Sequence, residues 1–91
     1  MELKWTSKAL SDLARLFDFL AVVNPQAAAR TVQALSQAPI SLLNNPRIGE
    51  RVEEFEPRDV RRLLVGRYEI RYEIQASTLY VLRLWHARED R

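Results

Sequence analysis

The chain has 91 residues, of which 47% are hydrophobic and 29% are charged, a balance typical of a compact soluble domain. This length gives room for one hydrophobic core, which predicts a single domain over residues 1–91 and excludes a separate cofactor-binding module. The 14 basic and 12 acidic side chains leave a net charge of +2, which is too small to predict strong nonspecific binding of nucleic acid.

The first half of the chain begins with a predicted strand and a predicted helix. Apolar and polar residues alternate over residues 2–5, which indicates a short strand, and Thr6 or Ser7 can cap the helix that follows. Apolar residues then recur at intervals of three and four, which indicates an amphipathic helix of about four turns. The predicted buried stripe comprises Leu10, Leu13, Ala14, Phe17, Leu20 and Ala21. The residues predicted to lie off this stripe are Asp12, Arg15 and Asp18.

A second helix is predicted to begin at the pair Asn24 and Pro25, because asparagine caps a helix and proline is tolerated at its first position. The connection over residues 22–24 is short, so the two helices should form an antiparallel hairpin. Pro39 lacks a backbone N–H and predicts a kink or break near Ala38. The residues predicted to face the core are Ala28, Val32, Leu35, Leu42 and Leu43.

The second half predicts three strands. An apolar and arginine-containing run over residues 60–65 stops at Gly66, and strict alternation over residues 68–75 is the clearest strand pattern of the chain. After a tight connection at residues 76–77, the largely apolar run 78–86 is typical of a central strand. The order β-α-α-β-β-β predicts an α+β domain, with the helical hairpin on one face of a small antiparallel sheet. The N-terminal strand should join an edge of the sheet or pair with the last strand.

Candidate chemistry centres on the one histidine. His86 ends the last predicted strand, where it can act as a general acid or base if the sheet brings Arg61, Arg62 or Arg83 close; otherwise it is a surface or sheet-edge residue. One histidine and no cysteine give no basis for a metal site, and neither of the two glycines lies in a phosphate-binding loop. The acidic run over residues 50–56, which lies next to Arg58, Arg61 and Arg62, could place a carboxylate and an arginine around a phosphodiester, but such a run is more often a solvated loop.

Three tyrosines lie in the predicted strands and can serve either of two purposes. Tyr68, Tyr72 and Tyr80 could stack on bases if they face outward, but their spacing relative to the isoleucines favours the core. The absence of cysteine favours a reducing compartment, and the sequence contains no apolar run as long as a signal peptide or a membrane span. We therefore expect a cytoplasmic protein that does not contact a membrane.

An ordered set of motifs runs along nearly the whole chain. In order these are A-x-x-D-L at residues 9–13, N-P-x-x-G at residues 45–49, R-R-L at residues 61–63, Y-x-I-x-Y at residues 68–72 and H-A-R at residues 86–88. Together they resemble the RelE/ParE superfamily of bacterial type II toxin–antitoxin systems. The resemblance implies a growth-inhibiting toxin that acts without a cofactor and is neutralised by a small antitoxin.

The resemblance leaves two targets open. RelE-like members are metal-independent, ribosome-dependent mRNA endonucleases, and this branch would assign Arg61, Arg62 and His86 to catalysis. The match to that branch is incomplete, because Ala87 stands where a tyrosine is expected and Glu69 lies near where an arginine is expected. The ParE branch, whose members act on DNA gyrase and have no known nuclease centre, fits better. The residues then expected to contact the target are Arg83, His86 and Arg88.

The resemblance also implies partners. A cognate antitoxin should cover apolar surface on the toxin, and the toxin–antitoxin complex should bind operator DNA through the antitoxin. A third reading is a non-toxic binding module that only co-represses its operon together with the antitoxin. The sequence therefore leans toward a toxin that is not an enzyme.

Overall fold

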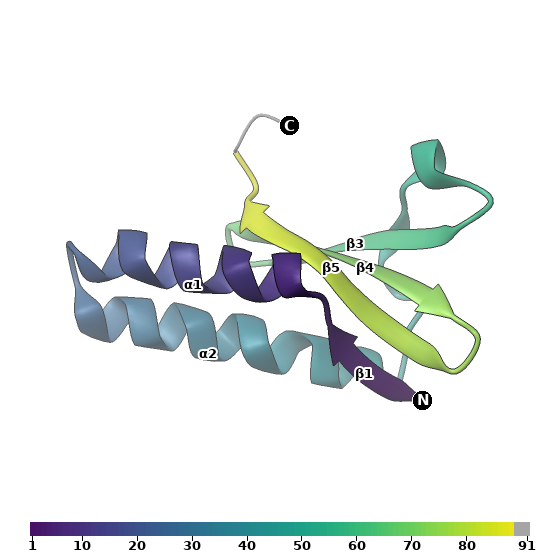
Figure 1. Cartoon of the computed structure of the whole chain (residues 1–91), viewed down its shortest axis with the longest axis horizontal. Coiled ribbons are helices and arrows are strands. Elements are labelled where there is room, and N and C mark those ends of the chain that lie inside the picture. Colours follow the sequence, from purple (N-terminus) through teal and green to yellow (C-terminus); the bar gives the residue numbers. More distant parts are fainter. Residues whose placement is uncertain (89–91) are drawn as a thin grey trace.

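The computed structural model describes residues 1–88 and shows the predicted element order in two layers (Figure 1). The first layer contains the helices, and the second is a five-stranded sheet with a short 3-10 turn, η1, before its third strand. The elements are β1 (Glu2–Trp5), α1 (Ser7–Ala21), α2 (Pro25–Leu42), β2 (Glu50–Arg51), η1 (Glu53–Phe55), β3 (Asp59–Val65), β4 (Tyr68–Gln75) and β5 (Thr78–His86). The predicted α+β fold is confirmed.

The strands are ordered β1-β5-β4-β3-β2 across the sheet. The N-terminal strand lies at an edge and also pairs with the last strand, so the two positions left open by the sequence are the same position. The β1–β5 pair is parallel, whereas the other neighbours are antiparallel, so the sheet is mixed rather than wholly antiparallel. The elements between β1 and β5, from α1 to β4, provide the long crossover connection that a parallel pair requires.

Both helices begin at the predicted caps and pack side by side as an antiparallel hairpin (Figure 1). The Thr6 hydroxyl accepts a hydrogen bond from the Ala9 N–H at 3.1 Å, and the Asn24 side chain accepts one from Ala27 at 3.1 Å. Of the kink or break predicted near Ala38, the break is wrong, because α2 continues to Leu42. Pro39 interrupts only the last turn, and its ring is fully buried in the core. Within residues 1–88, neither helix is long and apolar enough to cross a membrane.

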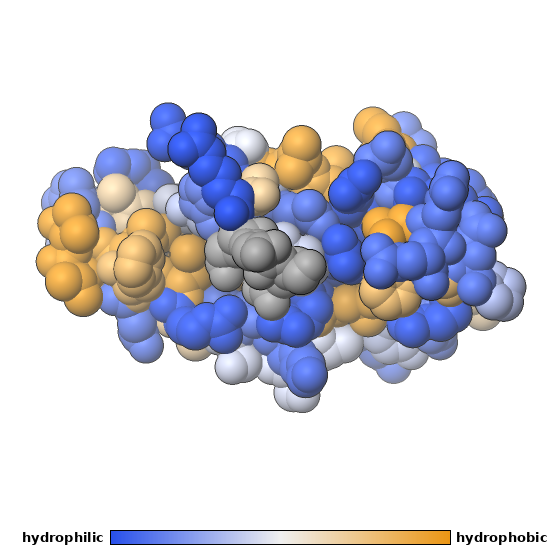
Figure 2. Space-filling view, turned by 90° about the horizontal axis from the view of Figure 1, so that it is seen from above, coloured by the Kyte–Doolittle hydropathy of each residue, from blue (hydrophilic) through white to orange (hydrophobic). Residues whose placement is uncertain are grey.

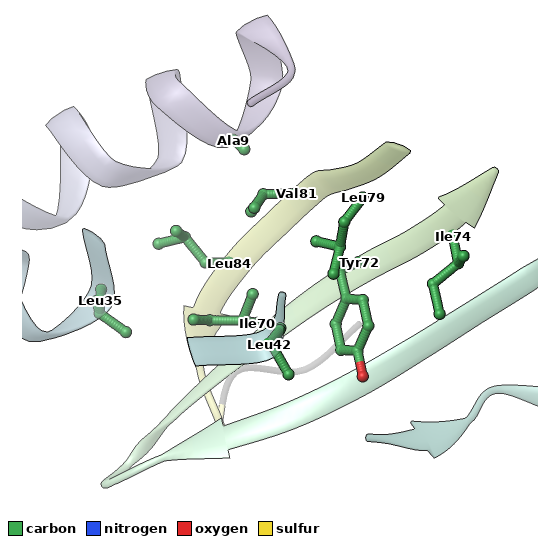
Figure 3. Close-up of a cluster of buried hydrophobic side chains, with 9 residues drawn as sticks. All are labelled: Ala9, Leu35, Leu42, Ile70, Tyr72, Ile74, Leu79, Val81 and Leu84. Atoms are coloured by element: carbon green, nitrogen blue, oxygen red, sulfur yellow. The ribbon is translucent and has the colours of Figure 1, made fainter. Parts of the chain in front are cut away.

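The core lies between the helical hairpin and one face of the sheet (Figure 3). It confirms Ala28, Leu35 and Leu42 as buried residues of α2, and Tyr72 as a fully buried residue of β4. The central cluster comprises Ala9, Leu35, Leu42, Ile70, Tyr72, Ile74, Leu79, Val81 and Leu84.

The predicted buried face of α1 is partly right, because Leu13 packs against the core and Leu20 and Ala21 are half-buried. Leu10 is 53% exposed and Phe17 is 37% exposed, whereas Ala9 and Asp12 are buried. The helix is rotated from the orientation that its most apolar stripe predicts, because α1 must lie against the edge of β5 as well as against α2. The helical hairpin therefore carries apolar side chains on its surface, and Figure 2 shows them gathered at the end where α1 joins α2. Those at this end are Phe19, Val22 and Val23.

The tight connection between β4 and β5 contains a residue in the left-handed region. Ala76 has φ 51°, a conformation that costs an alanine about 1 kcal/mol more than a glycine. We expect Ala76→Gly to raise the free energy of unfolding by about 0.5 kcal/mol, since the relief of strain exceeds the entropy that glycine adds to the unfolded chain. Urea denaturation measures the change. Ser77→Gly is the control and should be destabilising, because Ser77 does not have positive φ.

Candidate functional site

A groove of about 490 Å³ lies between α1 and the end of β5, and we call it the α1–β5 groove. Its walls are mostly apolar, with three basic side chains among them. His86 pairs with Tyr68 across β4 and β5, and their rings meet edge to face with centroids 5.3 Å apart. The Arg88 N–H donates to His86 Nδ1 at 3.1 Å. The lining residues are Arg15, Leu16, Phe19, Leu20, Tyr68, Leu84, Trp85, His86 and Arg88.

The structure therefore brings together two of the three residues expected to contact a target, His86 and Arg88. The third, Arg83, does not line the groove. Its guanidinium donates to the Asp12 carboxylate through Nε at 2.7 Å and through Nη2 at 3.1 Å. Asp12 thus fixes the Arg83 side chain against α1.

Asp12 is the residue whose importance the sequence reasoning missed. Its carboxylate is buried and also accepts the Leu84 N–H at 3.1 Å and the Arg15 guanidinium at 3.0 Å. Burial alone would raise the pKa of Asp12, but hydrogen bonds from Arg83 and Leu84 and the charge of Arg83 outweigh it and lower the pKa. Because β1 ends at Trp5, this carboxylate satisfies a backbone donor of β5 beyond the reach of β1. The sequence feature that could have identified Asp12 is the A-x-x-D-L motif, in which it is the aspartate.

Arginines form a row on the sheet face opposite the helices, which we call the open face. Arg62 pairs with Arg71 across β3 and β4, and Arg71 pairs with Arg83 across β4 and β5. Each of these guanidinium groups has a carboxylate partner, because Arg62 contacts Glu50 at 2.7 Å and Arg71 contacts Glu69 at 2.9 Å, while Arg83 contacts Asp12. The positive charge of this row is therefore largely compensated within the protein.

The sequence left open whether the sheet brings Arg61, Arg62 or Arg83 close to His86, and the strand register separates His86 from Arg61 and Arg62. Arg62 lies on the open face, whereas His86 and its pairing partner Tyr68 lie on the helix side. Arg61 does lie on the helix side, but it pairs with Tyr72, four residues along β4 from Tyr68, or roughly 13 Å at the rise of a β-strand. Strand register, which the sequence did not fix, separates the proposed catalytic groups.

Arg61 and Tyr72 instead hold the loop that contains the N-P-x-x-G motif. The Tyr72 hydroxyl donates to the Pro46 carbonyl at 2.8 Å and accepts the Gly49 N–H at 2.9 Å. Arg61 donates to the carbonyls of Arg47 and Gly49, each at 3.0 Å. Burial raises the pKa of the Tyr72 hydroxyl, which suits a neutral group that both donates and accepts. These motif residues thus hold the loop against the sheet.

The remaining predicted positions are the tyrosines and the acidic run. Tyr72 is core as predicted, Tyr68 packs against the core and also lines the α1–β5 groove, and Tyr80 is half-buried. The acidic run 50–56 is exposed at its glutamates, as predicted, although it also contains β2 and η1. Among residues 1–88, no three histidine or carboxylate side chains gather as a metal site would need.

Sequence comparisons place the chain among bacterial toxins. The family model for the ParE toxin of the type II toxin–antitoxin system parDE matches residues 3–91. Toxin RelE2 of Caulobacter vibrioides is 32% identical over 83 residues, covering 91% of both chains. Toxin RelE1 of the same organism is 33% identical over 84 residues, covering 92% of this chain and 90% of the relative.

Solved structures share this architecture. A chain of the chromosomal ParDE toxin–antitoxin system from P. aeruginosa superimposes with a TM-score of 0.82 at 25% identity, covering 97% of both chains. A chain of the RelBE2 toxin–antitoxin complex from Mycobacterium tuberculosis has the same fold, with a TM-score of 0.64 at 23% identity over 97% of this chain and 92% of that one. The motifs, the fold and the family match together show that the chain is a RelE/ParE superfamily toxin and belongs to the ParE toxin family of type II toxin–antitoxin systems.

Proposed function

We propose that this toxin inhibits growth by binding and poisoning DNA gyrase in the cytoplasm, and that a cognate antitoxin neutralises it. The family match to ParE toxins supports this target, as does the ParDE system to which the P. aeruginosa structure belongs. Both structural neighbours come from toxin–antitoxin systems, which supports the antitoxin partner. We further propose that the toxin–antitoxin complex binds operator DNA through the antitoxin.

The observation that carries the gyrase proposal is the separation of His86 from the arginine row. A metal-independent nuclease needs a cation and a proton-transferring group around one phosphodiester. Here His86 lies on the helix side of the sheet, and the arginines of the open face are already paired with carboxylates. This arrangement favours a toxin that acts by binding a protein over one that cleaves RNA.

The α1–β5 groove is our candidate for the target contact. Its apolar walls can accept an apolar side chain of a partner, while His86 and Arg88 offer hydrogen-bond and charge contacts beside them. Arg83 lies on β5, like His86, and its guanidinium is held by Asp12 of α1 at the edge of that strand. In this proposal all three residues take part, His86 and Arg88 in the groove and Arg83 at its border.

The first experiment is inhibition of supercoiling by purified gyrase. We expect wild-type toxin to inhibit at micromolar concentration and the double variant His86→Ala/Arg88→Ala to need at least tenfold more protein, which corresponds to about 1.4 kcal/mol of lost binding. Lys8→Ala, an exposed change on α1 outside the groove lining, is the matched control and should inhibit like wild type. Undisturbed supercoiling with folded wild-type toxin would contradict the proposal.

A second candidate is a ribosome-dependent mRNA endonuclease. The RelE names of the two Caulobacter relatives favour it. This function predicts cleavage of ribosome-bound mRNA that is lost in His86→Ala and in Arg62→Ala, whereas Arg61→Ala would also remove hydrogen bonds that hold the loop. Primer extension on translating ribosomes distinguishes the two targets. A protein that stays harmless when expressed without antitoxin would instead favour a non-toxic co-repressor.

A further inference from the structure

The segment between β2 and β3, residues 52–58, forms a strap that stands on the side of the sheet away from the helices (Figure 1). Its first residue is tied to the sheet, since the Val52 N–H donates to the Val60 carbonyl at 2.8 Å. The later backbone donors bond within the strap, with Phe55 bonding to Val52 at 3.2 Å and Arg58 to Phe55 at 3.0 Å. Side chains therefore make the contacts between the tip of the strap and the sheet.

The first of these contacts is an ion pair between the strap and β4. Arg58 donates to both carboxylate oxygens of Glu73, through Nε at 3.0 Å and Nη2 at 2.8 Å. The Glu73 side chain is 5% exposed, whereas that of Arg58 is 52% exposed. The carboxylate thus belongs to the rigid sheet and the guanidinium to the strap, so this bidentate pair joins a fixed element to a separable one.

The second contact is an aromatic stack on Arg71. The Arg71 guanidinium carbon lies 5.6 Å from the centre of the Phe55 ring and 4.8 Å from that of Trp85, so the guanidinium is held between the strap and β5. Glu69 accepts from Arg71 Nη2 at 2.9 Å. In the part of the chain that the structure describes, Arg71 Nε is buried and has no hydrogen-bond partner.

That unpaired donor bears on how firmly the strap is closed. A buried N–H without an acceptor has lost its water and gained nothing in exchange, which raises the free energy of the closed state. Moving Phe55 away would return Arg71 Nε to solvent or expose it to an acceptor on a partner. The closed strap is therefore stabilised by the Arg58–Glu73 pair and the ring contacts, and opposed by an unsatisfied donor.

We propose that residues 52–58 are a latched strap that can open: Phe55 covers the Arg71 guanidinium, which stacks on Trp85, and the Arg58–Glu73 ion pair is the latch that keeps Phe55 there. The inference goes beyond the proposed gyrase contact in the α1–β5 groove, because Trp85 also lines that groove but Phe55, Arg58 and Glu73 do not.

The test measures how well Trp85 is shielded. In a Trp5→Phe background Trp85 is the remaining tryptophan, so acrylamide quenching of fluorescence reports on it alone. We expect Arg58→Gln and Phe55→Ala each to raise the quenching constant at least threefold. Amide exchange of residues 52–58, read by mass spectrometry, should accelerate at least tenfold while that of β4 does not change.

The control is Glu56→Gln, an equally small change in the same strap, where Glu56 faces Arg51 at 3.8 Å with both side chains about half exposed. It should behave like wild type. Arg58→Gln also leaves Glu73 buried and unpaired, so Arg58→Gln/Glu73→Gln, which removes that charge, must open the strap as well. Quenching and exchange that stay at wild-type values in these folded variants would overturn the proposal, as would faster exchange that spreads equally through β4.

Discussion

Replacement of Asp12 by alanine is expected to lower the free energy of unfolding by about 3 kcal/mol. The change removes the acceptor for the Arg83 guanidinium and for the Leu84 N–H at the edge of β5. Arg83 is 31% exposed, so water recovers part of the loss, which sets the value at the lower end for a broken buried ion pair. A domain of this length has roughly 5–14 kcal/mol of stability in total, so the variant loses a large share of it.

Urea denaturation at neutral pH measures this loss, and Asp18→Ala is the matched control. Asp18 lies on the same helix and is exposed, so its removal should change stability by less than about 0.5 kcal/mol. Equal effects of the two substitutions would show that the Asp12 contacts do not stabilise the fold. An Asp12→Asn variant, which keeps an acceptor oxygen without the charge, should fall between wild type and alanine.

Stability should also fall with acid. The pKa of Asp12 is lowered, despite burial that acts to raise it, by Arg83 and Leu84, and the pKa of Glu73 is lowered chiefly by the hydrogen bond from Arg58. A lowered folded pKa means that the unfolded chain binds protons first. The contribution of these two carboxylates to the free energy of unfolding is therefore complete at pH values above the ordinary carboxyl pKa. It is lost as pH falls through the ordinary pKa and then through the lowered pKa of the folded state. Unfolding curves from pH 7 to pH 3 should show a smaller decline in Asp12→Ala.

Substitution of Gly49 by alanine is expected to cost about 3 kcal/mol, because the loop has no room for a methyl group. A Cβ atom there would overlap the Tyr72 hydroxyl and lie 2.7 Å from the Arg62 carbonyl oxygen and 2.9 Å from Tyr72 Cε1. The ring is fully buried and its hydroxyl is bonded to Pro46, so neither neighbour can move cheaply. The melting temperature should fall by on the order of 15 °C.

Gly66→Ala is the control for this steric argument. Gly66 has φ +59°, but a methyl group at this position would have nothing within 4 Å, so only backbone strain of about 1 kcal/mol is expected. Tyr72→Phe removes the overlapping hydroxyl and should recover part of the loss when it is combined with Gly49→Ala, giving a non-additive pair. Additive losses in the double variant would show that contact with Tyr72 is not the cause.

Local physical chemistry explains which features could be predicted. The caps at Thr6 and Asn24, the alternation over residues 68–75 and the length of the last strand depend on hydrogen bonds and periodicities within a few residues, and the structure confirms them. The burial of Tyr72 followed from the same alternation. The toxin family followed from motifs, although the structure shows that two of these, N-P-x-x-G and Y-x-I-x-Y, meet at one hydrogen-bonded loop.

Long-range packing explains the failures. The most apolar stripe of α1 is only partly its buried one, because Asp12 has to face β5 where β1 has ended. This requirement arises from residues about 70 positions away. Pro39 remains helical because its ring fills the core. His86 and Arg62 were candidates for one centre, but strand register places them on opposite faces of the sheet.

The sequence by itself thus determined the order of elements, the helix starts and membership of a toxin superfamily, because capping, periodicity and ordered motifs are properties of neighbouring residues. Only the tertiary structure decided which face of α1 is buried, which strand lies beside the first, and which charged groups meet. Those outcomes depend on how one sheet edge and one helix compete to satisfy backbone donors and bury apolar surface. No short segment carries that information.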